Sequence, residues 1–244
     1  MSNGFQLVIL DDHEAMSRRA AAELSAALHA KPDLLVCVAS GATPARAYDL
    51  FAEEGRAHPD AFHRLRILRL DEWGGLAADD PGSSEAQIRR QLVEPLALEA
   101  DRYFAFRGDA PQPDDECARI RGIVDRQGPI DVSVLGLGLN GHLGFNEPAP
   151  ELHAHAHVAE LSRTSREHSM LASARAVPAH GLTLGMVDLM RSRRVLLVVS
   201  GAHKREVLAR LVRGGLTTSL PGSLLRLHPD TLCLCDRAAA EGLA

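Results

Sequence analysis

One stretch of this chain, residues 130–148, constrains the fold more than any other. It begins with the apolar run Ile-Asp-Val-Ser-Val-Leu, which is typical of a strand buried on both faces. It then breaks into four glycines within nine residues, a density that an ordinary helix interior does not tolerate. This turn carries Asn140, His142 and Glu147, and Pro148 prevents a helix from continuing. A buried strand that ends in a glycine-rich turn with ionisable groups is the usual place for the active site of an α/β protein.

Short apolar runs alternate with helical patterns along the whole chain. We expect strands at residues 5–10, 34–39, 66–70, 103–106, 130–136, 195–200 and 232–235. We expect helices at about residues 12–30, 43–54, 85–98, 114–126, 163–174, 182–190 and 205–213. Asp11 or Asp12 can cap the first of them, and Asp236 opens a last one. This alternation predicts an α/β protein with a mostly parallel sheet and helices on both faces. Because no repeat, linker or change of composition interrupts it, we expect residues 1–244 to form a single domain.

Composition narrows the class of partner. The net charge is −5, and the chain has nine aromatic residues and no basic stripe, so no nucleic-acid partner is expected. No apolar run approaches the roughly 20 residues needed to span a bilayer, and the N-terminus does not resemble a secretion signal. We therefore expect no membrane partner and a cytoplasmic location. Four cysteines, at positions 37, 117, 233 and 235, show no metal or redox spacing and are expected to be buried thiols.

The segment Ser40-Gly41-Ala42-Thr43 follows the expected strand at 34–39 directly. Thr43 is a good N-cap and Pro44 suits the first helical position, so a helix is expected to begin there. Free N–H groups and the positive end of a helix dipole favour a phosphate at such a turn. An ordinary capped turn explains the same residues equally well. Lys204 lies at the equivalent place after strand 195–200, where it suits a phosphate partner or is a surface lysine.

Three ionisable groups are expected at the same edge of the sheet. Asp71 follows strand 66–70, and His142 and Glu147 lie in the turn after another strand. In a parallel sheet the carboxyl ends of strands share one side, so these groups can converge. An acid beside apolar neighbours such as Trp73 can have a raised pKa and act as a base. A helix cap, a salt bridge or a structural imidazole explains each group singly, whereas together they indicate a site.

Two patterns suggest a nucleotide or a metal and are better explained otherwise. Residues 136–141 match the G-x-G-x-x-G pattern of dinucleotide-binding sites. In such a site a helix begins at the pattern, which lies in the first βα unit of the fold, whereas here another glycine and a proline follow and the pattern lies past the middle of the chain. His153, His155 and His157 would share one face of a strand, as zinc ligands can. No nearby acid or cysteine completes that set, and an exposed edge strand produces the same alternation. We therefore predict neither a nucleotide nor a metal.

Six blocks of the chain carry a further signal when they are taken together. They are residues 39–44 (Ala-Ser-Gly-Ala-Thr-Pro), 70–73 (Leu-Asp-Glu-Trp), 135–148, 182–185 (Leu-Thr-Leu-Gly), 200–204 (Ser-Gly-Ala-His-Lys) and 227–229 (Leu-His-Pro). The set resembles the amino-sugar-phosphate deaminase/isomerase family, typified by glucosamine-6-phosphate deaminase. The resemblance implies a three-layer Rossmann-like fold, shared more distantly with 6-phosphogluconolactonases and ribose-5-phosphate isomerases, and a reaction without a cofactor. A small-molecule amino-sugar phosphate would become fructose 6-phosphate, or its epimer tagatose 6-phosphate, plus ammonia.

The resemblance also implies a role for each residue that matches the family's motifs. Asp71 would be the base that moves a proton from carbon 2 to carbon 1 of the sugar. His142 would open the sugar ring, with Glu147 orienting it and Asn140 beside it. The phosphate would be held by Ser40, Gly41, Ala42 and Thr43, with Lys204 and Arg166.

Three residues depart from the family's pattern. Asn140 replaces an aspartate that many members have, Trp73 replaces a tyrosine, and Ser165-Arg166 stands for a Thr-Arg pair. Trp73, with the segments 81–83 and 168–171, resembles the galactosamine-6-phosphate branch more than the glucosamine branch. The short segment after Asp236 argues against the allosteric site of hexameric members.

Other hypotheses stay open at this point. A 6-phosphogluconolactonase usually has Asp-Glu-Arg and Asp-Gly-His-x-x-Ser-Leu-Phe, where this chain has Asp-Glu-Trp and Phe145-Asn146-Glu147. A non-catalytic sugar-phosphate sensor would bind without turnover, and a dinucleotide-dependent oxidoreductase is the most distant reading. Residues 149–176 suit a lid. The sequence leaves open both a monomer and a homo-oligomer, and either epimer of the substrate.

Overall fold

A central sheet organises the molecule, for which a computed structural model describes residues 4–243. Within these residues, seven parallel strands lie in the order β1-β10-β9-β6-β2-β3-β5. They are β1 (Gly4–Leu10), β2 (Leu35–Val38), β3 (Arg66–Arg69), β5 (Tyr103–Phe104), β6 (Val132–Gly136), β9 (Arg194–Val199) and β10 (Asp230–Asp236). Every pairing in the sheet is parallel, so the carboxyl ends of its strands meet at one edge. The mostly parallel sheet predicted from the alternation is confirmed.

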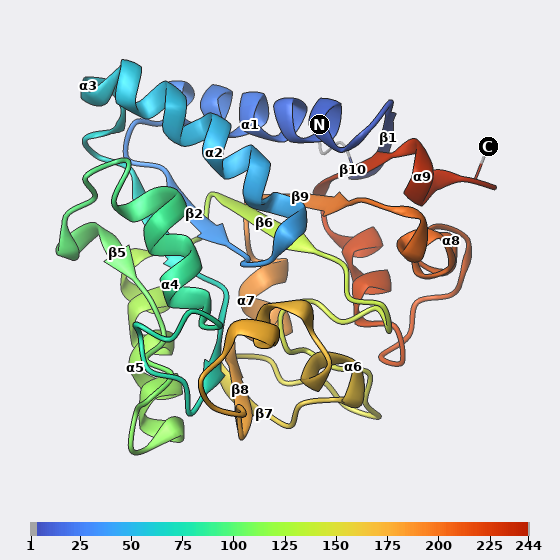
Figure 1. Cartoon of the computed structure of the whole chain (residues 1–244). Helices are drawn as coiled ribbons and strands as arrows, with labels where there is room; N and C mark the ends of the chain where they lie inside the picture. The colour runs from blue at the N-terminus through green and yellow to red at the C-terminus, as the bar shows by residue number, and fades with distance from the viewer. Residues whose placement is uncertain (1–3, 244) are drawn as a thin grey trace.

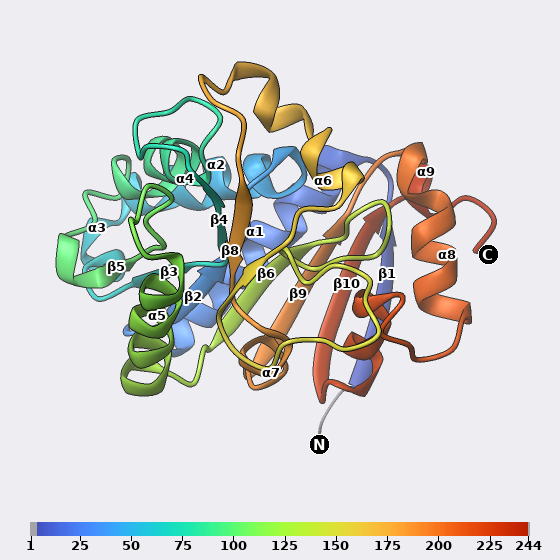
Figure 2. The same ribbon diagram turned by 90° about the horizontal axis from the view of Figure 1, so that it is seen from below.

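Helices cover both faces of this sheet (Figures 1 and 2). One face packs on α1 (His13–Ala30), α2 (Ala42–Ala57), α3 (Pro59–Phe62) and α4 (Ser84–Ile88). The other packs on α5 (Pro113–Gln127), α7 (Met186–Met190), α8 (Arg205–Arg213) and α9 (Arg237–Ala240). Strand β2 shows why, because its alternate side chains serve opposite layers: Leu35 and Cys37 join one core cluster and Val36 and Val38 the other. The three-layer α/β architecture is therefore the predicted one.

A second, smaller sheet lies beside the first and was not predicted. It is antiparallel, in the order β4 (Asp71–Gly74), β8 (His180–Thr183), β7 (His157–Ala159). The helix expected over 182–190 is wrong in its first part, because residues up to Thr183 pair with β4 instead. The helix α7 begins only after Gly185, whose N–H donates to the Asp188 side chain (3.1 Å). Long-range strand pairing overrides the helical pattern here.

Three other helix predictions need correction. Helix α2 begins at Ala42 and not at Thr43; Gly41, with φ of 108°, is its N-cap, so Thr43 does not cap it. The helix expected over 85–98 is α4 followed by a π-helical turn, Arg89–Val93. The helix expected over 163–174 is split into α6 (Arg163–Arg166) and a 3-10 turn, Ser169–Ser173. The break falls at His168, which is extended and whose ring accepts the N–H of Met170 (3.3 Å), so a local side-chain bond competes with the helix.

Two other predictions concern small features of the chain. Of the two candidate caps of α1, Asp11 and Asp12, the structure uses Asp12, whose carboxylate accepts the N–H of Ala15 (2.8 Å). All four cysteines are free and buried, in agreement with the prediction of buried thiols. Among the described residues, no helix has the length and apolar character to cross a membrane.

Candidate active site

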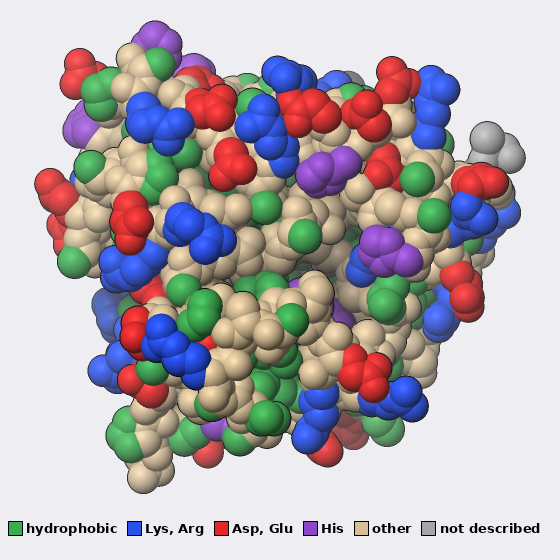
Figure 3. All heavy atoms as spheres, viewed as in Figure 1, with side chains coloured by type: hydrophobic (Ala, Val, Ile, Leu, Met, Phe, Trp, Pro, Cys, Tyr) green, Lys and Arg blue, Asp and Glu red, His purple; other side chains and the backbone are tan. Residues whose placement is uncertain are grey.

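A cavity of about 350 Å³ opens at the carboxyl ends of the central strands. It is lined by residues 39–44 after β2, by Asp71 and Trp73 of β4, by the glycine-rich turn after β6, by residues 164–170 and by His203 and Lys204. Figure 3 shows this side of the molecule hollowed near its middle, below the ends of β2 and β6 as they lie in Figure 1. Acidic and basic side chains are mixed over the face seen there, which suits a small molecule better than a nucleic acid.

Asp71 opens β4 and lines the cavity, and the residue is 8% exposed. Its Oδ1 atom has no hydrogen-bond partner within residues 4–243. Burial, and then the charge of Glu72, raise the pKa of Asp71 to about 7, although the Arg69 guanidinium opposes them. A group that gains and loses its proton near neutral pH can act as both base and acid.

The glycine-rich turn brings His142 against Glu147. His142 Nδ1 lies 3.1 Å from Glu147 Oε2, and the same oxygen accepts Asn140 Nδ2 at 2.7 Å. The other oxygen accepts Ser162 Oγ at 3.0 Å and also the hydroxyl of Ser165. With Nδ1 donating to Glu147, the second ring nitrogen of His142 remains as a proton acceptor. His142 lines the cavity, whereas Glu147 and Asn140 lie behind it.

Four donors on one carboxylate decide the charge of Glu147. Burial by itself would raise its pKa, but the hydrogen bonds from His142, Ser165 and Asn140 outweigh burial and lower the pKa to about 2. Glu147 is therefore an anion at all working pH values, and it holds His142 in one orientation. Asn140 can donate to Glu147 without adding a charge, while its own oxygen accepts the N–H of His142 (3.1 Å).

Two glycines of the same turn explain its shape. The His142 ring lies so close to Gly138 that an added Cβ would be 2.3 Å from it. Gly144 has φ of +58°, and an added Cβ would lie 2.6 Å from Thr183 Oγ1 and 3.3 Å from Asp71 Oδ2. These glycines therefore allow the turn to approach β4 and β8 closely, and they bring His142 and Asp71 to one cavity.

The opposite end of the cavity is built by the turn into α2. The N–H of Gly41 is taken by Gln87 Oε1 (3.0 Å), whereas the first-turn N–H groups of α2, such as those of Ala42 and Thr43, have no partner within a helix. Ser40 contributes a hydroxyl that lies 2.9 Å from Ser84 Oγ. A helix N-terminus of this kind favours an anion.

Lys204 also lines the cavity, from the segment after β9. Its Nζ donates to the Leu137 carbonyl (2.5 Å), and burial lowers its pKa. Arg166 is placed differently: it is exposed, its Nε donates to the Leu161 carbonyl (3.0 Å), and it is not among the residues that line the cavity. The structure thus brings nine of the ten predicted site residues to the cavity or directly behind it, and leaves Arg166 outside.

Some polar residues of the site were missed from the sequence. Ser162 contacts Glu147 from 15 residues away along the chain, and Gln87 contacts Gly41 from 46 residues away. No local sequence pattern predicts such contacts. The expected face of three histidines does not form a ligand set: His155 bonds to Asp188 (2.8 Å), whereas the rings of His153 and His157 stack at 4.2 Å. Within residues 4–243, no group of three or more His, Cys, Asp or Glu side chains is placed to hold a metal ion.

Comparison with known proteins gives a consistent picture. Residues 11–233 match the family described as glucosamine-6-phosphate isomerases/6-phosphogluconolactonase. The chain is 35% identical over 227 residues to AgaI of Escherichia coli K12, which is named as a deaminase, covering 93% of this chain and 90% of that protein. It is 33% identical over 231 residues to glucosamine-6-phosphate deaminase 1 of Bacillus subtilis, covering 94% and 96%.

Solved structures extend the comparison to the fold. A monomeric glucosamine-6-phosphate deaminase superposes with a TM-score of 0.91 at 32% identity, over 96% of this chain and 98% of the other. The 6-phosphogluconolactonase of Trypanosoma cruzi superposes with a TM-score of 0.80 at 21% identity, over 100% and 98%. At that identity the second likeness shows the common fold and not a common reaction.

Proposed function

The chain belongs to the glucosamine-6-phosphate isomerase/6-phosphogluconolactonase family, and on that premise we propose that it is an amino-sugar-6-phosphate deaminase. The reaction would convert galactosamine 6-phosphate or glucosamine 6-phosphate, with one water, into the ketohexose 6-phosphate and ammonia. One observation supports this most: the Asp71 carboxyl group shares a cavity with His142, which Glu147 holds. The Oδ1 atom of Asp71 has no hydrogen-bond partner among the described residues, and the pKa of Asp71 is about 7. Deaminases named for glucosamine 6-phosphate are among the relatives of this chain.

The ends of the cavity suggest how a sugar phosphate would lie. Its phosphate would meet the free N–H groups of Ala42 and Thr43 and the ammonium of Lys204. The Lys204 ammonium already lies beside the Leu137 carbonyl, so it is fixed over the glycine-rich turn. The sugar would then extend toward Asp71, and a cavity of about 350 Å³ lies within the usual range for small-molecule sites.

Each chemical step then falls to one group. The free ring nitrogen of His142 takes the proton of the anomeric hydroxyl and returns it to the ring oxygen, which opens the ring. Asp71 removes the proton from carbon 2 and delivers it to carbon 1, while oxygen 1 gains a proton and the amino nitrogen loses one, so that the amino aldose becomes a ketose imine. Water adds to the imine, and ammonia leaves. An acid with a pKa near 7 suits both halves of the proton transfer.

We propose galactosamine 6-phosphate as the preferred epimer. Two of the features that resemble the galactosamine branch, Trp73 and residues 168–170, line the cavity. The Trp73 ring lies 5.9 Å from the His168 ring and 4.6 Å from Phe145, so these side chains form one wall. Gly82 and its neighbours pack against Ala174 instead, away from the lining residues.

Side-by-side kinetics test this function. We expect ammonia release from both amino-sugar phosphates, with the higher kcat/KM for the galactosamine epimer, and no hydrolysis of 6-phosphogluconolactone. A higher kcat/KM for glucosamine 6-phosphate would overturn the preference only. Lactone hydrolysis without ammonia release would overturn the reaction, and tight sugar-phosphate binding without turnover would indicate a sensor.

A further inference from the structure

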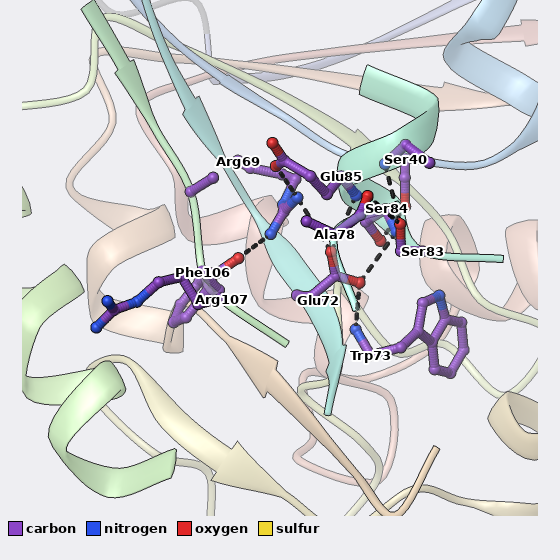
Figure 4. A network of polar contacts seen from close by, with 12 residues as sticks. Ser40, Arg69, Glu72, Trp73, Ala78, Ser83, Ser84, Glu85, Phe106 and Arg107 are labelled. Atoms are coloured by element: carbon purple, nitrogen blue, oxygen red, sulfur yellow. Dashed lines mark hydrogen bonds and ion pairs between the residues drawn. The ribbon is translucent and has the colours of Figure 1, made fainter. Parts of the chain in front are cut away.

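The short helix α4 contacts both β4, which carries the proposed base, and residues 40–43, the turn proposed to hold the phosphate (the phosphate turn). The reaction steps above do not use this helix. Its first two residues, Ser84 and Glu85, donate their N–H groups to the Glu72 carboxylate (3.0 and 2.9 Å). Glu72 directly follows Asp71 on β4 and is 1% exposed. Figure 4 shows this carboxylate pointing at the start of α4, with Ser40 beyond it. The helix is therefore fixed to the strand that carries the base.

The same helix also holds the turn between β2 and α2. Ser84 Oγ lies 2.9 Å from Ser40 Oγ. Gln87 makes two bonds to a single residue: the Gly41 N–H donates to its Oε1 (3.0 Å), and its Nε2 donates to the Gly41 carbonyl (2.9 Å). A side chain that satisfies both backbone groups of one glycine fixes the peptide planes on either side of it. Gly41 has φ of 108°, a conformation that glycine adopts freely and other residues rarely do, and this backbone freedom is what the two bonds restrict.

Buried charges keep α4 in place. Arg69, which is 0% exposed, lies between two carboxylates: its Nη1 is 3.0 Å from Glu72 Oε2 and also bonds to Glu85 (Figure 4). The Tyr103 hydroxyl donates to Glu85 as well (2.8 Å). Charges buried in this way are held strongly, because separating them would leave one unpaired in an apolar environment. The start of α4 is thus a rigid support.

We propose that Gln87, assisted by Ser84, is a positioning residue for the substrate's phosphate. Glu72 fixes the position of α4 relative to Asp71, its neighbour on β4. Gln87 in turn fixes Gly41 relative to α4, and with it the N–H groups of Ala42 and Thr43. The bridge thereby sets the distance between the phosphate and the base. Because Gln87 occupies the Gly41 N–H itself, the phosphate is left with the two N–H groups that follow. This inference rests on the proposed function, since it needs a phosphate at the turn.

The test compares three variants with the whole wild-type chain. Gln87→Leu removes both bonds to Gly41, and Ser84→Ala removes the single bond to Ser40 while keeping its N–H on Glu72. Gln91→Leu is the matched control, because Gln91 Oε1 accepts Gln87 Nε2 (3.1 Å) but, within residues 4–243, makes no hydrogen bond to residues 39–44. Two measurements are made on each: KM and kcat with the amino-sugar phosphate, and the Kd of inorganic phosphate by calorimetry. A melting curve for each variant reports whether it is folded.

We expect Gln87→Leu to raise both KM and the phosphate Kd about tenfold or more, since two hydrogen bonds are lost. The value of kcat should also fall, but by less than KM rises, because a looser turn changes the distance between the phosphate and Asp71. Ser84→Ala should raise KM and the phosphate Kd about threefold, and Gln91→Leu should stay within about twofold of wild type. A folded Gln87→Leu variant with unchanged KM and phosphate Kd would overturn the inference, as would a fall in kcat alone. If Gln87→Leu does not fold, an unchanged Ser84→Ala variant overturns it. A wild-type protein that binds phosphate without releasing ammonia would refute the proposed function and still test Gln87 through the calorimetry.

Discussion

Two carboxyl groups of the site have opposite surroundings, and these separate their pKa values. Asp71 is buried beside Glu72, so its pKa rises to about 7, and its Oδ1 has no hydrogen-bond partner among the described residues. Glu147 is partly buried too, but four donors reach it and its pKa falls to about 2. Paired acids with diverging pKa values are typical of an active site in which one group moves protons and another orients.

Replacing the base should remove activity without removing binding. We expect Asp71→Asn to lower kcat by roughly 10²- to 10⁴-fold, the usual contribution of a general base, with KM changed little. Asp101→Asn, an exposed residue of the same type, is the control. Steady-state kinetics with an ammonia-coupled assay measure both variants. Full activity in Asp71→Asn would contradict its role.

The raised pKa of Asp71 also predicts how activity and stability depend on pH. The base must be ionised, so kcat/KM should rise with pH and level off above about pH 7. Folding favours the neutral acid, so the stability cost of Asp71 is absent below its unfolded pKa of about 4 and complete above about pH 7. The melting temperature of Asp71→Asn should therefore exceed that of wild type at pH 8, and the difference should shrink at pH 5. An equal difference at both pH values would count against the raised pKa.

Asn140 should support Glu147 by donating a neutral hydrogen bond. Asn140→Leu removes that bond and the acceptor for the His142 N–H, so kcat should fall about tenfold or more. Asn140→Asp instead places a second carboxylate beside Glu147 Oε2, which raises the pKa of Glu147 by charge repulsion. Because Asp71 already sets the fall of the rate below about pH 7, protonation of Glu147 in Asn140→Asp should add a second, steeper fall at lower pH, while activity at high pH is kept. Matching profiles of Asn140→Asp and wild type would show that Asn140 does not act through Glu147.

At the scale of elements, the predictions succeeded where the cause is local. The sequence predicted strands β2, β6 and β9 and an Asp cap for α1, because an apolar run or an Asp N-cap depends only on neighbouring residues. Strand β4 was missed, since it is four residues long and exists only because it pairs with residues 180–183, more than 100 positions later. The split of the helix at 163–174 was missed because one ring, that of His168, bonds to the backbone.

The candidate site follows the same division. Its position could be predicted, since the polar residues after parallel strands meet at one edge. Its supporting contacts could not be, because Ser162, Ser165 and Gln87 come from segments whose distance from the site depends on the tertiary fold. Arg166, assigned from the resemblance alone, lies outside the cavity lining for the same reason.

The glycine-rich turn should tolerate no side chain beneath His142. In Gly138→Ala the new methyl group would overlap the His142 ring, which must move away from its place beside Glu147. A displacement of about 1 Å in a catalytic group can lower the rate roughly 100-fold, so we expect a large fall in kcat in a folded protein. Gly215→Ala is the control, because an added Cβ there has nothing within 4 Å. Equal kinetics for the two variants would mean that the position of His142 is unimportant.

At the scale of the whole molecule, the two sheets cooperate in one site. In the large parallel sheet, residues 40–43, proposed to hold the phosphate, follow β2, and the glycine-rich turn with His142 follows β6. The small antiparallel sheet supplies the proposed base, Asp71, because β4 carries this residue and pairs it with β8. The central claim is therefore that Asp71 transfers a proton within a substrate held between the two sheets.

Deuterium at carbon 2 of the substrate follows that proton most directly. We expect wild type to release ammonia and to deliver part of the label to carbon 1 of the ketose, with the rest lost to water from the Asp71 carboxyl. In Asp71→Asn, both the transfer and the loss of label should fall together with ammonia release. Ammonia release with all deuterium kept at carbon 2, or label transfer that persists in Asp71→Asn, would contradict the account.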